Sequence, residues 1–398
     1  MNIRPEKHPQ TALMPFRPIY LDCHATTPVD PRVADLMVQV MTTNFGNPNN
    51  RGHFFGDEAA DIVHAARIEV GQLVNGSSEN VVFLRSATVA ASGVIASAVQ
   101  SNVSSSPLRV ASTTVEHRAV LDALSKREAA GEIRMNWLPV DTRAQLSIEA
   151  VRSVLDNGCD LLCVMAANNE VGTVYPIAEI ASLARDADVS LLVDATQAAG
   201  HIPINMDTWG ITYLLMSAHK MYGPKGIAAL VSGQGANADF RDLERAEGTP
   251  NVPGIAGFGE ACRLCREEML QTSQRISGLR DRLERLLGER IDGLVVNGDR
   301  VARLGHNLHV SIPGTPNEAV VARLSQSVAL STGSACQWGT DQPSHVLQAM
   351  GLSDELQESA IRIGLGKTTS QLDVDRAAEL IAAAVEDVRR IMLSRGIR

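Results

Sequence analysis

Aromatic residues and cysteines are scarce in this 398-residue chain, which has three tryptophans, four tyrosines, seven phenylalanines and six cysteines. The cysteines stand at positions 23, 159, 163, 262, 265 and 336, and such a scattered set excludes the disulfide framework of a small secreted domain. Hydrophobic residues still make up 44% of the chain, which excludes a disordered or collagen-like protein. The length and composition predict a globular protein with a large core and two or three domains.

The sequence also lacks long apolar runs and an excess of positive charge. No stretch reaches the roughly 20 apolar residues of a membrane-spanning helix, and the first 18 residues lack the apolar segment of a signal peptide. The formal net charge is −9, whereas direct binding of nucleic acid needs clustered lysine and arginine. We therefore expect a cytoplasmic protein with reduced thiols, without membrane or direct nucleic-acid contact.

Short apolar runs alternate with helical patterns along the first two thirds of the chain. The segment 57–75 has apolar residues at helical spacing, and Gly76 is expected to end that helix as a C′ glycine. Strand-sized apolar runs lie at 81–84, 161–165, 191–193, 213–216 and 227–231. Runs of this length without alternation predict a parallel sheet that helices cover on both faces, and therefore an α/β fold.

The last third has a different pattern. The residues from about 256 to 290 predict one long connecting helix, and a strand at 307–312 and a helix from about Leu372 predict a second, smaller unit. We predict a large domain over residues 17–268, and a small domain made of residues 1–16 and 269–398.

Three polar residue sets follow predicted strands, where ligands of open α/β sheets bind. Asp194 follows one strand, Lys220 follows another, and Ala87 and Thr88 open the helix after a third. Singly, Asp194 and Thr88 are typical helix caps, and a loop lysine is usually a solvated charge. Together they suit pyridoxal phosphate, which needs a lysine for a Schiff base, an acid for its pyridine nitrogen and a helix N-terminus for its phosphate. No glycine-rich nucleotide loop and no second metal-ligand pair beside Cys262 and Cys265 competes, so no metal site is expected.

Eight motifs then give the chain a specific resemblance. They are Tyr20-Leu-Asp-Cys-His-Ala-Thr-Thr-Pro28, Phe45-Gly-Asn-Pro48, Val115-Glu-His117, Asn168-Asn-Glu170, Asp194-Ala-Thr-Gln197, Ser217-Ala-His-Lys220, Ser331-Thr-Gly-Ser-Ala-Cys336 and Ile361-Arg362. With these motifs, from Ile19 to about Asp375, the chain resembles the cysteine desulfurases of the NifS/IscS kind (group I), in the class V aminotransferase family. The resemblance implies the aspartate-aminotransferase-like fold type I of pyridoxal-phosphate transferases, with a mostly parallel seven-stranded sheet in the large domain and a smaller α+β domain that carries the cysteine loop.

The resemblance also implies roles for the matching residues. Lys220 would hold pyridoxal phosphate as a Schiff base, Asp194 would pair with the pyridinium nitrogen, and His117 would stack on the ring and move protons. Gln197 and Asn169 would contact the phenolic oxygen and the substrate side, and Arg362, with Asn169, would bind the substrate carboxylate. The phosphate would be held by Ala87, Thr88, Ser217 and His219, and by Thr249 from the partner subunit of a homodimer.

Cys336 would determine the reaction. Its surroundings, STGSACQWGTDQPS, are small and polar, which is typical of a mobile loop, and a thiolate is a strong sulfur nucleophile. The resemblance implies that L-cysteine becomes L-alanine and that Cys336 carries its sulfur as a persulfide to an acceptor protein. The acceptor would serve iron–sulfur cluster assembly, tRNA thiolation or DNA phosphorothioation.

The chain departs from the family pattern near the cofactor. Val89 stands where a glutamate is common, and Ala246 stands where an arginine is usual, beside Glu247. These departures leave two alternatives open: another pyridoxal-phosphate reaction, such as that of a selenocysteine lyase or an aminotransferase, or a non-enzymatic sulfur-relay or scaffold subunit. Cys159, Cys163, Cys262 and Cys265 are expected to be core residues, whereas Cys23, where an aromatic residue is usual, lies near the expected pocket.

Overall fold

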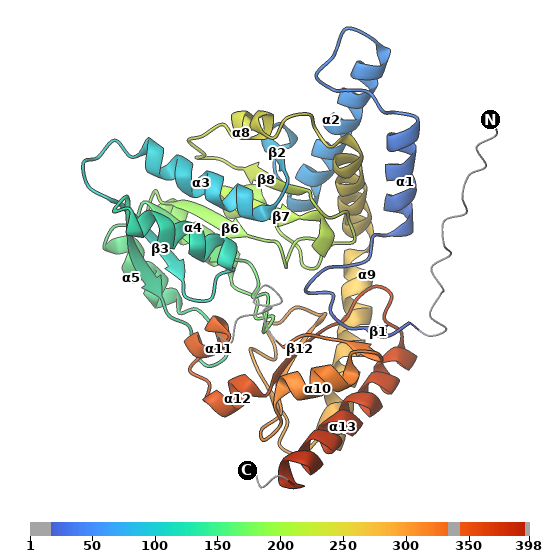
Figure 1. The fold of residues 1–398 in the computed structure, drawn as a ribbon. Helices are drawn as coiled ribbons and strands as arrows, with labels where there is room; N and C mark the ends of the chain where they lie inside the picture. The colour runs from blue at the N-terminus through green and yellow to red at the C-terminus, as the bar shows by residue number, and fades with distance from the viewer. Residues whose placement is uncertain (1–16, 333–342, 395–398) are drawn as a thin grey trace, which may run out of the picture.

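A seven-stranded sheet lies at the centre of the larger part of the molecule (Figure 1). The computed structural model describes residues 17–332 and 343–394. In spatial order the strands are β2 (Val81–Leu84), β8 (Ala228–Ser232), β7 (Tyr213–Ser217), β6 (Ser190–Asp194), β5 (Leu161–Met165), β3 (Leu108–Thr113) and β4 (Ile133–Leu138). Among these seven strands, β8 alone runs in the opposite direction to the other six. The predicted α/β class and mostly parallel seven-stranded sheet are therefore confirmed.

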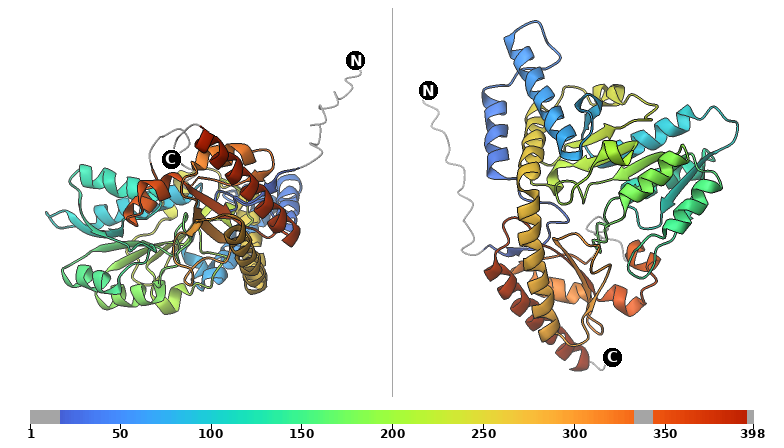
Figure 2. Two further views of the ribbon diagram at one scale, coloured as in Figure 1. Left: turned by 90° about the horizontal axis from the view of Figure 1, so that it is seen from below. Right: turned by 180° about the vertical axis from the view of Figure 1, so that it is seen from behind.

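Helices cover both faces of this sheet (Figures 1 and 2). Helices α3 (Ala87–Ser101) and α4 (Arg118–Ala129) supply the apolar residues that pack on one face. The other face is covered by α2 (Phe54–Val74), α5 (Ile148–Asp156), α6 (Ile177–Asp186) and the first half of α9 (Val252–Arg290). Strands between two helical layers need apolar side chains on both faces, which is why β5 and β7 are buried at every position.

Shorter elements complete this part. Helix α1 (Pro31–Thr42) packs along α9, and α7 (Met206–Trp209) and α8 (Arg241–Ala246) lie in connections, as do the 3-10 helices η1 (Ser78–Asn80) and η2 (Ala218–Lys220). The expected end of α2 is wrong in one detail. Asn75, with φ of 51°, takes the left-handed position that we assigned to Gly76, and asparagine tolerates this conformation better than most residues.

The C-terminal part has its own small sheets and core. A three-stranded antiparallel sheet has the order β12 (Ala360–Gly364), β10 (Asn307–Ser311) and β9 (Val295–Val296), and β1 (Ile19–Tyr20) pairs with β11 (Val328–Ala329). Helices α10 (Asn317–Leu324), α11 (His345–Ala349), α12 (Asp354–Glu358) and α13 (Gln371–Ser394) accompany these strands. A separate hydrophobic core joins β1, β10, β12, α10, α13 and the second half of α9.

Helix α9 connects the two cores. Its 39 residues correspond to a length of about 60 Å, and Figure 2 shows it running along much of the molecule. Ala256 and Phe258 belong to the core under the large sheet, whereas Ile276 and Leu283 belong to the C-terminal core. The domain boundary at residue 268 stays a prediction, and residues 1–16 of the predicted small domain lie outside the described residues.

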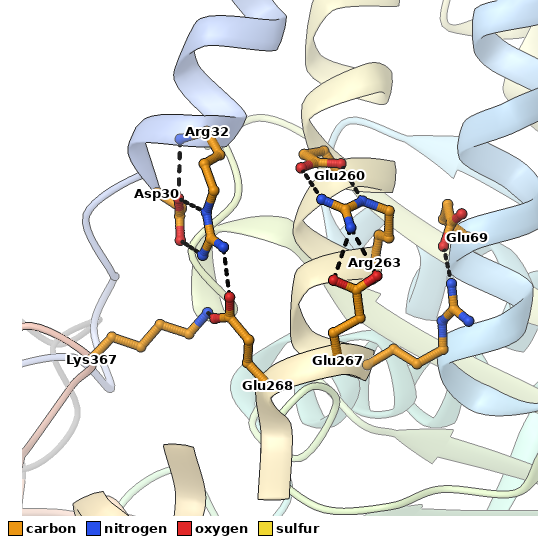
Figure 3. A network of polar contacts seen from close by, with 9 residues as sticks. Asp30, Arg32, Glu69, Glu260, Arg263, Glu267, Glu268 and Lys367 are labelled. Atoms are coloured by element: carbon orange, nitrogen blue, oxygen red, sulfur yellow. Dashed lines mark hydrogen bonds and ion pairs between the residues drawn. The ribbon is translucent and has the colours of Figure 1, made fainter. Parts of the chain in front are cut away.

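Ion pairs join α9 to its neighbours near this boundary (Figure 3). Glu268 on α9 accepts from Arg32 of α1 at 2.6 Å and from Lys367, which follows β12, at 3.0 Å. Two residues earlier, Arg266 pairs with Glu69 of α2 at 2.6 Å. Glu268 therefore links α1, α9 and the loop after β12.

Candidate active site

The carboxyl ends of β5, β6 and β7 place polar residues side by side at one edge of the large sheet. Asp194 is the last residue of β6; it is paired with Met165 of β5 and with Leu215 of β7, two residues before Ser217. Lys220 ends η2, which follows β7 directly. This is the edge at which the sequence predicted a ligand site.

The Lys220 amine is held by the loop after β1. Its Nζ donates to the carbonyl oxygens of His24 and Ala25, the latter at 3.0 Å. Gln197 Nε2 donates to the same His24 oxygen at 3.1 Å. One backbone carbonyl therefore brings together Lys220 and Gln197, two of the residues predicted to contact the cofactor.

Buried histidines surround Lys220. His24 stacks on His306 with 4.6 Å between ring centroids, and His201 contacts the Lys220 carbonyl oxygen through Nε2 at 3.0 Å. Burial lowers the pKa of His24 well below its ordinary value, and the charges of Arg362 and Lys220 lower it further. Burial also lowers the pKa of His201 and of His219 to about 4; the charge of Lys367 adds to this effect at His201, and the charges of Lys220 and Lys225 add to it at His219. All three imidazoles are therefore neutral at pH 7 and act as hydrogen-bonding groups rather than charges.

Two buried carboxyl groups at this edge have different environments. Asp194 is 7% exposed, and its Oδ1 accepts from the Thr196 N–H at 2.9 Å. Glu116 is fully buried, and burial raises its pKa to about 8, with the charge of Asp194 raising it as well. Glu116 is thus protonated at pH 7. A buried Asp194 carboxylate needs a cationic partner, and a protonated pyridine nitrogen would supply one.

The residues predicted to hold the phosphate differ in exposure. Ser217 is buried, and His219 Nδ1 contacts Thr26 Oγ1 at 3.1 Å. Thr88 lies in the first turn of α3, whose N-cap Ser86 accepts from the Val89 N–H. Both β2 and β7 run antiparallel to β8, so the start of α3 lies at the same sheet edge as Ser217. Thr88 and Thr249 are exposed, and Thr249 lies between α8 and α9.

Arg362 and Asn169 form the predicted substrate end. The Arg362 guanidinium is buried; Nη1 donates to the Asn169 carbonyl oxygen at 3.1 Å, and Nη2 pairs with Asp22 at 3.3 Å. In the described part of the chain, the buried Arg362 Nε and Asn169 Oδ1 have no hydrogen-bond partner. A buried donor and a buried acceptor without partners are typical of a site that receives a polar ligand. The carboxylate of an amino acid can accept hydrogen bonds from a guanidinium group.

His117 is the N-cap of α4. Its Nδ1 accepts from the Ala119 N–H at 3.1 Å. The preceding strand, β3, is next to β5, which places His117 at the same edge as Asp194.

The donor set fits pyridoxal phosphate. It provides one amine, one buried carboxylate, hydroxyl and imidazole groups after β7, and a helix N-terminus after β2. The assigned roles of these residues stay predictions. The remaining predicted residue, Cys336, lies outside the described residues.

The departures from the family pattern also have structural counterparts. Glu247 accepts from the Arg85 side chain and from its backbone N–H, both at 3.1 Å, so it joins the α8–α9 loop to the turn between β2 and α3. Arg245 pairs with the exposed Asp242. Val89 is partly buried against the hydrophobic core between the large sheet and helices α3 and α4.

The other cysteines are buried thiols. Cys159, Cys163, Cys262 and Cys265 belong to the hydrophobic cores, as predicted. Cys23 is 4% exposed, and burial, with the charge of Asp22, raises its pKa to about 12. A thiol with this pKa is a poor nucleophile at pH 7.

Sequence reasoning missed three contacts of the site. Asp22 pairs with Arg362, the His24 carbonyl accepts from Lys220, and Thr26 contacts His219. All three residues lie in the motif at 20–28, which was recognised as a motif but received no role. Its position after β1, remote in sequence from β7, hid these contacts.

Comparison with known proteins gives concordant results. Residues 19–377 match the family Aminotransferase class-V. A cysteine desulfurase IscS of Anaeromyxobacter sp. (strain Fw109-5) is 38% identical over 387 residues, covering 94% of each chain. A solved NifS-like protein superposes with a TM-score of 0.84 at 28% identity, covering 93% of this chain and all of the other. The solved structure titled "SspA in complex with cysteine" gives a TM-score of 0.74 at 25% identity, with 88% and 100% coverage.

In the part that the structure describes, no helix is both long and apolar enough to cross a membrane.

The family match covers nearly the whole chain, and the resemblance inferred from the eight motifs is confirmed. The chain belongs to the class-V aminotransferase family, as a relative of its cysteine desulfurases.

Proposed function

We propose that this protein is a pyridoxal-phosphate-dependent cysteine desulfurase. The observation that carries the proposal is the junction of Lys220, Gln197 and the Arg362–Asn169 pair at one sheet edge, in a chain closely related to cysteine desulfurases. In the net reaction the thiol of Cys336 and L-cysteine give a Cys336 persulfide and L-alanine. The Cβ–S bond of the substrate breaks, and a new S–S bond forms on Cys336.

Pyridoxal phosphate supplies an electron sink that weakens bonds next to the substrate Cα. The Lys220 amine, which donates to the His24 and Ala25 carbonyl oxygens, is the group that would hold it. Asp194 would keep the pyridine nitrogen protonated, and Ser217, His219 and the α3 N-terminus, with Ala87 and Thr88, would hold the phosphate.

The chain's own groups would perform the remaining steps. Arg362 Nε, with Asn169, would orient the substrate carboxylate. Lys220 or His117 would take the Cα proton, because both stand at the edge where the substrate must lie. The Cys336 thiolate would attack the substrate sulfur and later pass it to an acceptor protein.

The quaternary state is part of the proposal. Phe45, Phe54 and Phe55 form an exposed aromatic patch, in which the Phe55 ring contacts those of Phe45 and Phe54, and an exposed apolar patch of this kind marks an interaction surface. We assign the patch to a second copy of the chain, in a homodimer that brings Thr249 to the partner's phosphate site. Light scattering of the purified protein tests this, because a monomer at micromolar concentration would contradict it.

The acceptor is proposed to be a protein of iron–sulfur cluster assembly, tRNA thiolation or DNA phosphorothioation. The five described cysteines are free thiols, which supports a reducing, cytoplasmic location. Native co-purification followed by identification of the bound protein would select among the three pathways.

The proposed activity has a direct test. Purified protein should show the visible absorbance of lysine-bound pyridoxal phosphate and should release L-alanine from L-cysteine. Lys220→Ala should lose both properties. Release of a keto acid, or turnover of selenocysteine alone, would contradict the proposal and favour another pyridoxal-phosphate reaction, whereas a colourless, inactive protein would favour a sulfur-relay or scaffold subunit.

A further inference from the structure

The residues that flank the Cys336 segment in sequence, on either side, are hydrogen-bonded to residues of the sequence motifs that form the candidate site. On the N-terminal side, Ser331 exchanges backbone hydrogen bonds with Arg362 at 2.7 and 3.2 Å, and its hydroxyl donates to Asp22. On the C-terminal side, Ser344 and His345 bond to Glu170 and Glu116. The second set of contacts involves buried acidic residues to which neither the family motifs nor the proposed reaction gave a role.

The Ser344 hydroxyl makes two hydrogen bonds. Its Oγ donates to Glu170 Oε2 at 2.5 Å and accepts from the Leu347 N–H at 3.2 Å, as the N-cap of α11. Glu170 is fully buried, and its other oxygen, Oε1, has no hydrogen-bond partner in the described part of the chain. Ser344 therefore supplies the hydrogen bond to one of the two oxygens of the Glu170 carboxyl group.

The neighbouring His345 makes a parallel contact. Burial lowers its pKa, so the ring is neutral and its Nε2–H donates to the Glu116 carbonyl oxygen at 3.0 Å. Glu116 directly precedes His117. The start of α11 is thus bonded to the turn that holds the proposed proton carrier.

The two turns that receive these contacts are themselves joined. Asn168 Nδ2 donates to the Val115 carbonyl oxygen at 3.2 Å, and Asn168 Oδ1 accepts from the Glu170 N–H at 2.9 Å. Residues 115–117, residues 168–170 and Ser344 therefore form one hydrogen-bonded unit. This unit contains His117 and Asn169, the residues proposed to act on the substrate.

Helix capping alone does not require Glu170. Ser353 caps α12 in the same way, accepting from the Leu356 N–H at 3.4 Å, and among the described residues its hydroxyl has no buried carboxyl partner. A buried carboxyl group with one oxygen unpartnered is costly, and a backbone carbonyl or an amide would serve the Ser344 hydroxyl equally well for folding. The 2.5 Å hydrogen bond to Glu170 fixes the orientation of the Ser344 hydroxyl.

We propose that Glu170 and Ser344 are positioning residues for sulfur transfer. Their hydrogen bond fixes the start of α11, just after the Cys336 segment in sequence, relative to the turns that hold Asn169 and His117. The proposal rests on the proposed desulfurase function. It assigns the pair to the step in which the Cys336 sulfur meets the substrate sulfur, and not to binding of cofactor or cysteine.

Ser344→Ala tests the proposal, with Ser353→Ala as the matched control. Both variants remove an N-cap serine, but only the first removes a donor to Glu170. We expect Ser344→Ala to lower kcat for alanine release about tenfold, the scale of a lost hydrogen bond that leaves a buried partner unsatisfied, while KM and the absorbance change on adding cysteine stay within twofold. Ser344→Thr, which keeps the hydroxyl, should restore most of kcat, and Ser353→Ala should have the wild-type kcat.

Amide hydrogen exchange supplies a readout that does not depend on activity. The amides of residues 345–349 should exchange faster in Ser344→Ala than in Ser344→Thr. Equal kcat in Ser344→Ala and wild type, equal losses in the two alanine variants, or a loss confined to KM would overturn the proposal. A wild-type protein that makes no alanine would instead refute the proposed function, so the two failures are distinguishable.

Discussion

Arg362→Lys probes how the proposed substrate end recognises a carboxylate. The Arg362 side chain is 3% exposed, and two of its nitrogens are already bonded to Asn169 and Asp22. The third, Nε, is buried without a partner in the described part of the chain. Lysine keeps the positive charge but has a single nitrogen, so it cannot satisfy Asp22, Asn169 and a substrate carboxylate in the same fixed geometry.

The magnitude follows from the number of bonds lost. A hydrogen bond to a charged group contributes about 1.5–3 kcal/mol, so kcat/KM for L-cysteine should fall about 10- to 100-fold. The substrate carboxylate is bound before and during the reaction, so most of the loss should appear in KM. Steady-state alanine release and titration with cysteine, followed by cofactor absorbance, measure the two effects.

Arg303→Lys is the matched control. Arg303 is also 3% exposed and pairs with Glu284 at 2.8 Å and with Asp281 at 4.0 Å, but among the described residues it is not bonded to any that is predicted to bind cofactor or substrate. Arg303→Lys therefore measures what replacing a buried, ion-paired arginine by lysine does to the stability of the fold. If Arg362→Lys keeps the wild-type KM, or if Arg303→Lys changes KM equally, Arg362 does not bind the substrate carboxylate.

Two further predictions concern stability. Glu116 has a pKa of about 8 in the folded protein, above its ordinary 4.5, so the folded state holds more protons and wild-type stability falls as pH rises from about 4.5 through 8. Glu116→Gln should remove this loss, so its free energy of unfolding in urea, relative to wild type, should rise by several kcal/mol from pH 5.5 to pH 8.5. The same difference between variant and wild type at both pH values would refute the raised pKa of Glu116. Glu268→Gln removes the partly exposed ion pairs to Arg32 and Lys367 and should cost about 0.5–1 kcal/mol at low salt, less in 1 M salt. Glu289→Gln, which loses one exposed pair with Arg285, should cost clearly less, and a loss as large as that of Glu268→Gln would contradict this reasoning.

Much of the fold could be predicted from local sequence. Strands β2 and β5 are continuous apolar runs because both of their faces are buried, and such runs are visible without any tertiary information. Strands β3 and β4 were not predicted. Arg109 and the polar end of β3 interrupt its pattern, and β4 lies at the sheet edge, where its middle residues are accessible.

The candidate site was predictable where a residue directly follows a strand. Asp194 and Lys220 belong to this class, because their positions depend on one element each. The contacts of Asp22, Glu170 and Ser344 depend instead on segments more than 170 residues apart in sequence. Their pairing follows from the tertiary fold, so only the structure could assign it.

The central claim is that Cys336 receives the sulfur of L-cysteine while the other residues hold cofactor and substrate. Cys336→Ala and wild type should be mixed with one equivalent of L-cysteine and examined by mass spectrometry of the protein. The account predicts one added sulfur atom on Cys336 in the wild type, and in the variant no persulfide and no alanine, although its cofactor absorbance and its spectral response to cysteine persist. Normal alanine release by Cys336→Ala would contradict the account.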